Sequence, residues 1–323
     1  MPTEPLPRLD EETEVRNVLL SFCRLKPGEI WIDPVSGHKV GVLNAASRSD
    51  IVRIFESERS TLVINDPPYN ITVGKKKSFA LFHTNLEDYL AFSRKWVENA
   101  LHIMADNSHL YIWLGADQNE NFQPLPDFMI MMRNFKALKT RSYITVRNQR
   151  GYGTQKNWMC IRQELLYYVK GNPDFTVVYT EIPKVLKGYY KVIKGKLTEN
   201  LERSKSETIR PGNVWLDIQQ VFYRMEENVP GAYAQKPLTA IERIILSSSQ
   251  AGDTVADFFS HSGTTLIAAE RLNRKCITLD CDPLFAELTI RRLEHYRKTG
   301  KRGWQYAHPF PEIEGTVYPA NKS

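Results

Sequence analysis

The sequence predicts an α/β fold in which a doubly wound, mostly parallel sheet carries helices on both faces. Apolar, β-branched runs such as residues 62–64 are typical of strands buried on both sides. These runs alternate along the chain with longer segments whose apolar residues recur at helical spacing. Two of the runs end in loops of rigid or small polar residues, at 65–70 and 260–265. In such sheets, ligands bind at the carboxyl ends of the strands.

A chain of 323 residues is long enough for one large α/β domain with an inserted lobe. No apolar run approaches the roughly 18 residues that a membrane span needs. The first residues lack the basic start and apolar core of a signal peptide. The four cysteines are scattered without the spacing of metal ligands, so we expect reduced thiols and no metal site. A formal net charge of +6 fits a polyanionic partner, and we expect a cytoplasmic protein that does not bind membranes.

The first part of the chain predicts a short extension before the main sheet. Residues 1 to 12 are acidic and punctuated by proline, which predicts a loose arm. Helical spacing predicts a helix over 14–25, and two strands joined by a turn are expected within 28–42. Ser49 is the expected cap of a helix that precedes the strand at 62–64.

The remaining chain predicts alternating strands and helices interrupted by one segment of different composition. Strands are expected at 109–114, 142–146, 165–169, 254–259 and 276–279. Helices are expected at 86–104, 127–135, 238–246, 266–272 and 283–297. A loop is expected at 147–158. In 171–233 helical spacing weakens and lysine, tyrosine and glycine dominate, so we expect a separate recognition lobe there.

The segment Asp66-Pro67-Pro68-Tyr69 directly follows the strand at 62–64. Its prolines prevent both ladder pairing and helix formation, so the chain leaves the strand as a stiff loop. The loop offers the Asp66 carboxylate, backbone carbonyls and the Tyr69 ring, which are groups suited to holding a flat heterocycle that bears an amino group. A proline-rich turn without a function is the alternative at this point.

A second segment, residues 255–265, combines a strand, a loop of small and hydroxyl-bearing residues, and a helix start. Free N–H groups at such a helix start suit a carboxylate or a phosphate. Asp280 ends the next expected strand, where an acid accepts from ribose hydroxyls in nucleotide-binding α/β folds. The alternatives are an ordinary α/β turn for the loop and, for Asp280, a helix cap before Pro283.

Together these segments resemble the β class of S-adenosylmethionine-dependent DNA amino-methyltransferases. Asp66-Pro67-Pro68-Tyr69 followed by Asn70 is similar to their catalytic motif IV, and residues 257–265 are similar to their cofactor loop, usually Phe-x-Gly-Ser-Gly-Thr-Thr. Gln235-Lys236-Pro237 is similar to the tripeptide that precedes that loop. The catalytic motif comes before the cofactor loop, which is the permuted order of the β class.

The resemblance implies a Rossmann-like class I methyltransferase sheet with a smaller target-recognition lobe, S-adenosylmethionine as cofactor and double-stranded DNA as partner. The implied domains are an N-terminal arm and extension at 1–42, a permuted catalytic domain at 43–170 and 234–300, a target-recognition lobe at 171–233 and a tail at 301–323. The implied catalytic residues are Asp66, Pro67, Pro68 and Tyr69. The implied cofactor-binding residues are Asn44, Asp66, Lys236, Asp257, Phe258, Phe259, Ser260, Ser262, Gly263, Thr264, Thr265 and Asp280.

The sequence departs from the family pattern at two positions. His261 stands in place of the first glycine of the cofactor loop, which adds bulk and a titratable ring beside the cofactor. Asn44 stands where many members have an Asp that meets the adenine of the cofactor, and its carbonyl oxygen can still accept a hydrogen bond.

Basic residues are concentrated in the middle of the chain. Between Arg141 and Arg210 there are fourteen Lys and Arg against six Asp and Glu. We predict that DNA is bound by Lys76, Arg147, Arg150, Tyr152, Lys156, Lys187, Lys191 and Lys194. A solvated lysine-rich surface is the alternative, and an ordinary exposed loop whose Trp158 packs on the sheet is the alternative for 147–158.

The leading hypothesis is methylation of the N6 of an adenine flipped out of duplex DNA, in a bacterial restriction–modification system. The chain would act in the cytoplasm at the nucleoid, as a monomer or homodimer, with a cognate restriction endonuclease as a candidate partner. Cytosine-N4 methylation, RNA methylation and a nucleic-acid-binding protein with an impaired cofactor site are the alternatives. An Asp rather than a Ser at position 66 favours adenine within the family.

Overall fold

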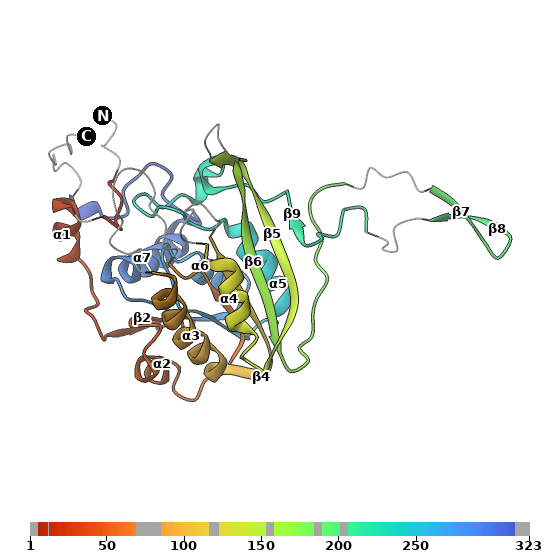
Figure 1. Cartoon of the computed structure of the whole chain (residues 1–323). Helices are drawn as coiled ribbons and strands as arrows, with labels where there is room; N and C mark the ends of the chain where they lie inside the picture. The colour runs from red at the N-terminus through yellow and green to blue at the C-terminus, as the bar shows by residue number, and fades with distance from the viewer. Residues whose placement is uncertain are drawn as a thin grey trace.

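The computed structural model describes residues 6–11, 13–68, 85–115, 123–152, 158–183, 189–200 and 206–313. In this part of the chain a nine-stranded sheet has the order β1-β2-β11-β10-β3-β4-β6-β5-β9 and carries helices on both faces (Figure 1). The strands of this sheet are β1 (Ile30–Ile32), β2 (Lys39–Val42), β3 (Ser60–Asn65), β4 (Met104–Leu114), β5 (Leu138–Tyr152), β6 (Cys160–Lys170), β9 (Val214–Trp215), β10 (Thr254–Asp257) and β11 (Lys275–Asp280). The helices are α1 (Glu14–Leu20), α2 (Arg48–Phe55), α3 (Leu86–Ile103), α4 (Pro124–Met132), α5 (Leu238–Ser248), α6 (Thr264–Arg271) and α7 (Pro283–Thr299), with 3-10 turns at Val221–Tyr223, Met225–Glu227 and Pro311–Ile313.

The order of the strands reverses between β3 and β10. These two strands are parallel neighbours, with Leu62 opposite Val255 and Val63 opposite Ala256. From β3 the chain runs through α3 to β4 on one side, and from β10 it runs through α6 to β11 on the other. Ligands of doubly wound sheets bind at such a switch point, outside the carboxyl ends of the strands.

Alternating side chains of the strands build a core on each face of the sheet. Leu62 and Ile64 pack with α5, α6 and α7, whereas Val63 between them packs with α2, α3 and α4. All three side chains are buried, because both faces are covered. This arrangement follows from the two-residue period of a strand and explains why the sequence of β3 is continuously apolar. The predicted doubly wound α/β fold is confirmed.

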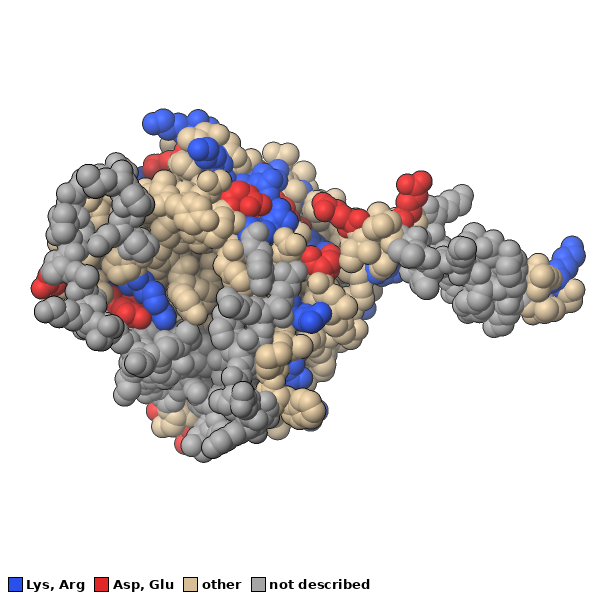
Figure 2. All heavy atoms as spheres, turned by 90° about the horizontal axis from the view of Figure 1, so that it is seen from above, with Lys and Arg blue, Asp and Glu red and all other residues tan. Residues whose placement is uncertain are grey.

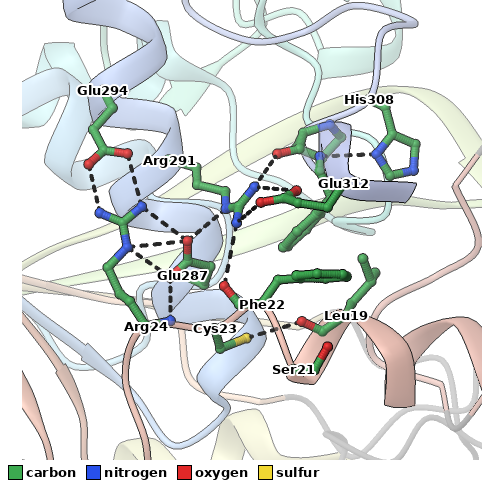
Figure 3. Close-up of polar contacts among 12 residues, drawn as sticks. Leu19, Ser21, Phe22, Cys23, Arg24, Glu287, Arg291, Glu294, His308 and Glu312 are labelled. Atoms are coloured by element: carbon green, nitrogen blue, oxygen red, sulfur yellow. Dashed lines mark hydrogen bonds and ion pairs between the residues drawn. The ribbon is translucent and has the colours of Figure 1, made fainter. Parts of the chain in front are cut away.

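The N-terminal extension is attached to the outer side of α7. Arg24 forms ion pairs with Glu287, which is buried, and with Glu294, which lies two turns further along α7 (Figure 3). Leu9 is almost fully buried, and its N–H donates to the carbonyl of Gly231. The prediction of a loose arm is therefore wrong for residues 6–11, because burial of Leu9 and its backbone hydrogen bond hold the segment in place.

Three local expectations differ from the structure. Ser47, not Ser49, caps α2, because its side chain accepts the N–H of Asp50. Residues 147–152 continue β5 rather than forming a loop, because Arg147 and Tyr152 pair with Arg162 and Cys160 of β6 on either side of a register shift. Val214–Trp215, within the segment expected to form the recognition lobe, pairs with β5 and adds the last strand of the sheet.

The rest of the described lobe contains a separate hairpin. Strands β7 (Tyr189–Ile193) and β8 (Lys196–Asn200) pair only with each other and lie apart from the main sheet (Figure 1). Figure 2 shows basic and acidic side chains interspersed on the upper face of the molecule. The division of the chain into domains stays a prediction. No helix in the described ranges is both long and apolar enough to span a bilayer.

Candidate active site and cofactor pocket

Asp66 is the first residue after β3, at the switch point of the sheet. Its Oδ2 accepts a hydrogen bond from Nζ of Lys236 at 2.5 Å. The Lys236 ammonium also lies 5.3 Å from the ring centroid of Trp113. Lys236 is buried, whereas the Asp66 side chain keeps 23% of its surface exposed. The carboxylate is therefore held by a buried ammonium, while part of the side chain remains accessible to solvent.

The strand end beneath Asp66 is fixed by a side chain. Asn65 is fully buried, and its Oδ1 accepts the N–H of Phe258 at 3.0 Å. This bond joins the ends of β3 and β10, where the parallel ladder no longer pairs the two chains. The two loops that follow these strands consequently lie next to each other.

The cofactor loop, defined here as residues 260–265, turns tightly into α6. The N–H of Gly263 donates to the carbonyl of Ser260 at 2.7 Å, and the N–H of Ser260 donates to the carbonyl of Leu279 at 2.9 Å. Gly263 is the N-cap of α6, and no side chain caps the helix. The first N–H groups of α6 are thus available to an anionic or polar ligand.

Any residue other than glycine would be strained at position 263, for two reasons. Its φ of +71° lies in the left-handed region. A Cβ on it would lie 3.0 Å from Cα of Thr289 on α7. The close approach brings α7 against the back of the cofactor loop.

A pocket that opens to solvent lies between the Asp66 loop and the cofactor loop, and its empty space is about 320 Å³ with the open mouth included. It is lined by Ile64, Asp66, Trp113, Lys236, Ile241, Asp257, Phe259, Ser260, His261, Ser262, Thr264 and Thr265. The structure thereby brings together eight of the predicted cofactor-binding residues. Ile64, Trp113 and Ile241 were missed by the sequence reasoning, because an apolar residue lining a pocket has the same sequence signal as one in the core.

Two acids, the buried Asp257 and the half-buried Asp280, stand at the carboxyl ends of β10 and β11. Burial raises the pKa of Asp257 to about 7, and burial together with the charge of Asp282 raises the pKa of Asp280 to about 7. The Asp280 carboxylate accepts the N–H groups of His261 and Asp282, each at 3.0 Å. Asp282, and not Asp280, caps α7, so the alternative of a helix cap does not account for Asp280.

His261 occupies a backbone conformation that favours glycine. Its φ is +44°, in the left-handed region. Its ring lies 4.7 Å from the ring of Phe285, and burial lowers its pKa to about 4. The imidazole is therefore neutral at physiological pH and forms part of the pocket wall.

Arg292 of α7 holds the cofactor loop from behind and was missed by the sequence reasoning. It is fully buried and donates to the carbonyl of Ser262 at 2.8 Å and to Oγ1 of Thr264 at 3.0 Å. The same guanidinium donates to the carbonyls of Glu227 and Arg302. One side chain thus joins the cofactor loop to the segment before α5 and to the segment after α7.

Several other predicted site residues lie away from the pocket or outside the described residues. Phe258 packs in the core against Phe55, with ring centroids 6.0 Å apart, and does not line the pocket. Asn44 is exposed, and its Oδ1 accepts the N–H of Ala46 within its own loop. Pro67 is buried and Pro68 is half-buried beside Asp66.

Of the predicted DNA-binding residues, Arg147 and Lys194 are exposed on β5 and on the turn of the β7–β8 hairpin. Tyr69, Lys76, Lys156 and Lys187 lie outside the described residues. The side chains of Arg150, Tyr152 and Lys191 are likewise outside them, although their backbones belong to β5 and β7.

The pocket residues fit the S-adenosylmethionine that the sequence implies. Oγ of Ser260 is buried in the pocket wall and has no hydrogen-bond partner among the described residues. The uncapped start of α6 suits a carboxylate. Asp280 ends β11 and does not line the pocket, so its expected contact with ribose hydroxyls stays a prediction. A buried hydroxyl without a partner is costly unless a ligand completes it.

Comparisons with known proteins agree with these features. A family model described as DNA methylase, of the N6/N4 methyltransferases, matches residues 61–291. The chain is 28% identical over 239 residues to the type II methyltransferase M.HpaI of Haemophilus parainfluenzae, covering 74% of this chain and 69% of that relative. It is 27% identical over 245 residues to the DNA adenine methyltransferase YhdJ of Escherichia coli K12, covering 74% of this chain and 79% of that relative.

Solved structures share the fold. A structure of TTHA0409 from Thermus thermophilus complexed with S-adenosyl-L-methionine has a TM-score of 0.50 and 22% identity, covering 81% of this chain and 94% of that chain. The PvuII DNA methyltransferase, titled cytosine-N4-specific, has a TM-score of 0.51 and 14% identity, covering 73% of this chain and 81% of that chain. At these identities the likeness concerns the fold.

Proposed function

Because the chain belongs to the N6/N4 family of S-adenosylmethionine-dependent DNA methyltransferases, we propose that it methylates the exocyclic N6 of adenine in duplex DNA. The observation that carries this proposal is the position of Asp66. Its carboxylate stands at the switch point of the sheet, beside a pocket whose residues fit the methyl donor. The finer choice of adenine rests on an Asp at this position and on the printed name of the relative YhdJ.

The chemistry requires help because the amino group of a base is a poor nucleophile. Its lone pair is delocalised into the ring, and attack on a methyl group makes the nitrogen more tetrahedral. Acceptors that face its hydrogens favour this geometry, and they are most effective where charge develops in the transition state. We assign this role to the Asp66 carboxylate and the Pro67 carbonyl, with the Tyr69 ring stacked on the base.

Lys236 gives Asp66 a fixed orientation in this scheme. Its ammonium donates to Oδ2 and so fixes the carboxylate beside the pocket. S-adenosylmethionine supplies an activated methyl group on a positively charged sulfur. The protein then contributes mainly alignment, through the cofactor loop on one side and the Asp66 loop on the other.

The target base must leave the duplex to reach this site. An amino group inside a base pair is inaccessible to a pocket at the edge of a sheet, so enzymes of this kind act on a flipped base. Arg147, Arg150 and the other basic residues predicted above would hold the phosphates around it. The type II names of several relatives support a role in restriction–modification, with a cognate endonuclease as candidate partner.

The test is to express the protein in a host whose DNA lacks modification and to identify the methylated nucleosides after digestion. N6-methyladenine is the expected product, and sequencing that detects modified bases would map the recognised site. N4-methylcytosine would refute the adenine assignment and support the nearest alternative. Methyl transfer to RNA but not to duplex DNA would refute DNA as the substrate. Absence of S-adenosylmethionine binding in calorimetry would support an impaired cofactor site.

A further inference from the structure

The far end of the β5–β6 hairpin extends past the edge of the sheet that carries the site. The last residue of β4, Leu114, pairs with Glu164 of β6. Strand β6 begins four residues earlier, at Cys160, and β5 continues to Tyr152 opposite it. At about 3.3 Å per residue, the paired strands run about 13 Å beyond the end of β4. Figure 1 shows β5 and β6 as a long pair of arrows.

This overhang stands beside the Asp66 loop. Strand β4 alone separates β6 from β3, and neighbouring strands are about 5 Å apart. In the register of the sheet, Asn65 is level with Ile112, and Ile112 is level with Leu166. The overhang thus rises about 10 Å to the side of the site, at the edge of the sheet that carries Asp66.

Two arginines oppose each other at the base of the overhang. Arg147 of β5 pairs in register with Arg162 of β6, so their side chains share one face of the hairpin. Like charges directly opposite each other destabilise a strand pair. Glu164 lies 3.3 Å from Arg162 and offsets part of this repulsion. A phosphate backbone is the partner whose charge would turn the pair into a stabilising feature.

Large apolar side chains are exposed just before β6. The side chain of Trp158 is 94% exposed and that of Met159 is 65% exposed. The alternative in which Trp158 packs on the sheet is therefore wrong. Aromatic side chains stack on bases without regard to sequence, and apolar side chains inserted between bases unstack them. A two-stranded ribbon is narrow enough to enter the major groove of DNA.

We propose that the β5–β6 overhang is a DNA-inserting arm, in which Trp158 stacks in the duplex where the flipped base leaves a gap and Arg147 and Arg162 hold the flanking phosphates. This inference rests on the proposed function, because it assigns a partner and a role to a surface beside that site. A second protein copy is disfavoured as the occupant, because Glu164 offsets only part of the charge of the two arginines and a closed interface would desolvate the rest.

The experiment compares substrates that differ in the energy needed for flipping. One duplex carries the site mapped for the wild type, and the other carries the same site with the target adenine opposite an abasic position. Trp158→Ala should lower kcat/KM at least about tenfold on the matched duplex, as expected for loss of one base stack. The loss should shrink to within about threefold on the abasic duplex, because an unpaired base flips more easily. Trp158→Tyr keeps a ring and should retain most activity.

The arginines are tested with a matched control on another part of the surface. Arg147→Gln with Arg162→Gln should weaken binding to both duplexes and reduce the salt slope of log K by about 2. Arg53 is the control, because its side chain is 50% exposed and paired with Asp50, as that of Arg162 is 53% exposed and paired with Glu164. Arg53→Gln should leave binding and the salt slope unchanged.

Each other outcome overturns the proposal. A change of less than about twofold for Trp158→Ala on the matched duplex, or an equal loss on both duplexes, would exclude insertion into the stack. A change of oligomeric state in light scattering, with methylation intact, would assign the surface to a protein partner. These results leave the proposed function standing if the wild type methylates DNA, whereas a wild type without methyl transfer refutes that function first.

Discussion

Nζ of Lys236 lies 2.5 Å from Oδ2 of Asp66, although 170 residues separate the two in the chain. The carbonyl of Lys236 also accepts the Oγ1 hydroxyl of Thr264 at 3.4 Å, at the start of α6. One residue thus contacts Asp66 through its side chain and the cofactor loop through its backbone. Lys236 therefore fixes the Asp66 carboxylate relative to the cofactor loop.

Replacing the Asp66 carboxylate should abolish most turnover. We expect Asp66→Ala and the isosteric Asp66→Asn to lower kcat by about 10²–10³, because each removes an acceptor that acts where charge develops. Transfer of labelled methyl groups to DNA measures the rate. Calorimetric binding of S-adenosylmethionine is the control and should change little. Unchanged turnover in either variant would remove the carboxylate from the mechanism.

Cofactor affinity should depend on pH through Asp280. Because its pKa is raised to about 7, the folded protein favours the protonated carboxyl, and this contribution to stability is lost as pH rises through about 7. Ribose hydroxyls donate to the charged form, so affinity for S-adenosylmethionine should increase from pH 6 to pH 8. Calorimetry across this range checks the slope. Asp280→Asn should bind more weakly and with a flatter profile, although Asp257 retains part of the slope. If affinity in Asp280→Asn rises with pH as steeply as in the wild type, the pH dependence does not come from Asp280.

The cofactor loop should not tolerate a methyl group at Gly263. Gly263→Ala combines left-handed backbone strain with a contact to Thr289, and we expect a loss of about 2–4 kcal/mol in the free energy of unfolding. Gly252→Ala is the matched control, because φ is +87° there and a Cβ would meet nothing within 4 Å. It should lose only about 1–2 kcal/mol. Urea denaturation measures both, and equal losses would exclude the contact with α7.

Arg292 should act as a positioning residue for the cofactor loop. Arg292→Met leaves the carbonyls of Ser262 and Glu227 without their buried donor, and we expect a loss of about 3 kcal/mol in stability. The surviving folded protein should show a raised KM for S-adenosylmethionine with a smaller effect on kcat. Arg53→Met, at an exposed ion pair, should change stability by less than about 0.5 kcal/mol. A fall in kcat alone would place Arg292 in another role.

The strands and the two loops of the site could be predicted because their signals are local. An apolar run in β3 and the prolines after it constrain the same few residues that they describe. The extension of β5 over 147–152 could not be predicted, since polar residues become a strand there only through pairing with β6. Ser47 and Ser49 are chemically equivalent candidates, and only the path of the chain decides which one caps α2.

The role of Arg292 shows a second limit. Arg291 and Arg292 are neighbours on α7 and have the same local sequence signal. Arg291 forms ion pairs with the buried Glu287 and with the partly exposed Glu312, as Figure 3 shows, whereas the side chain of Arg292 is fully buried. Its partners come from segments near residues 227, 262 and 302. No local pattern places these segments around one guanidinium.

The adjacency of β3 and β10 has a consequence for synthesis of the protein on the ribosome. Translation adds about 5–20 residues per second, so roughly 10–40 s pass between the emergence of β3 and that of β10 about 190 residues later. During this interval Asp66 has left the exit tunnel but Lys236 has not been joined to the chain for most of the time. The ion pair of Arg24 forms later still, because its partner Glu287 is added to the chain 263 residues after it. The proposed site is therefore incomplete on the nascent chain, and we expect methylation to begin only when most of the enzyme has been made.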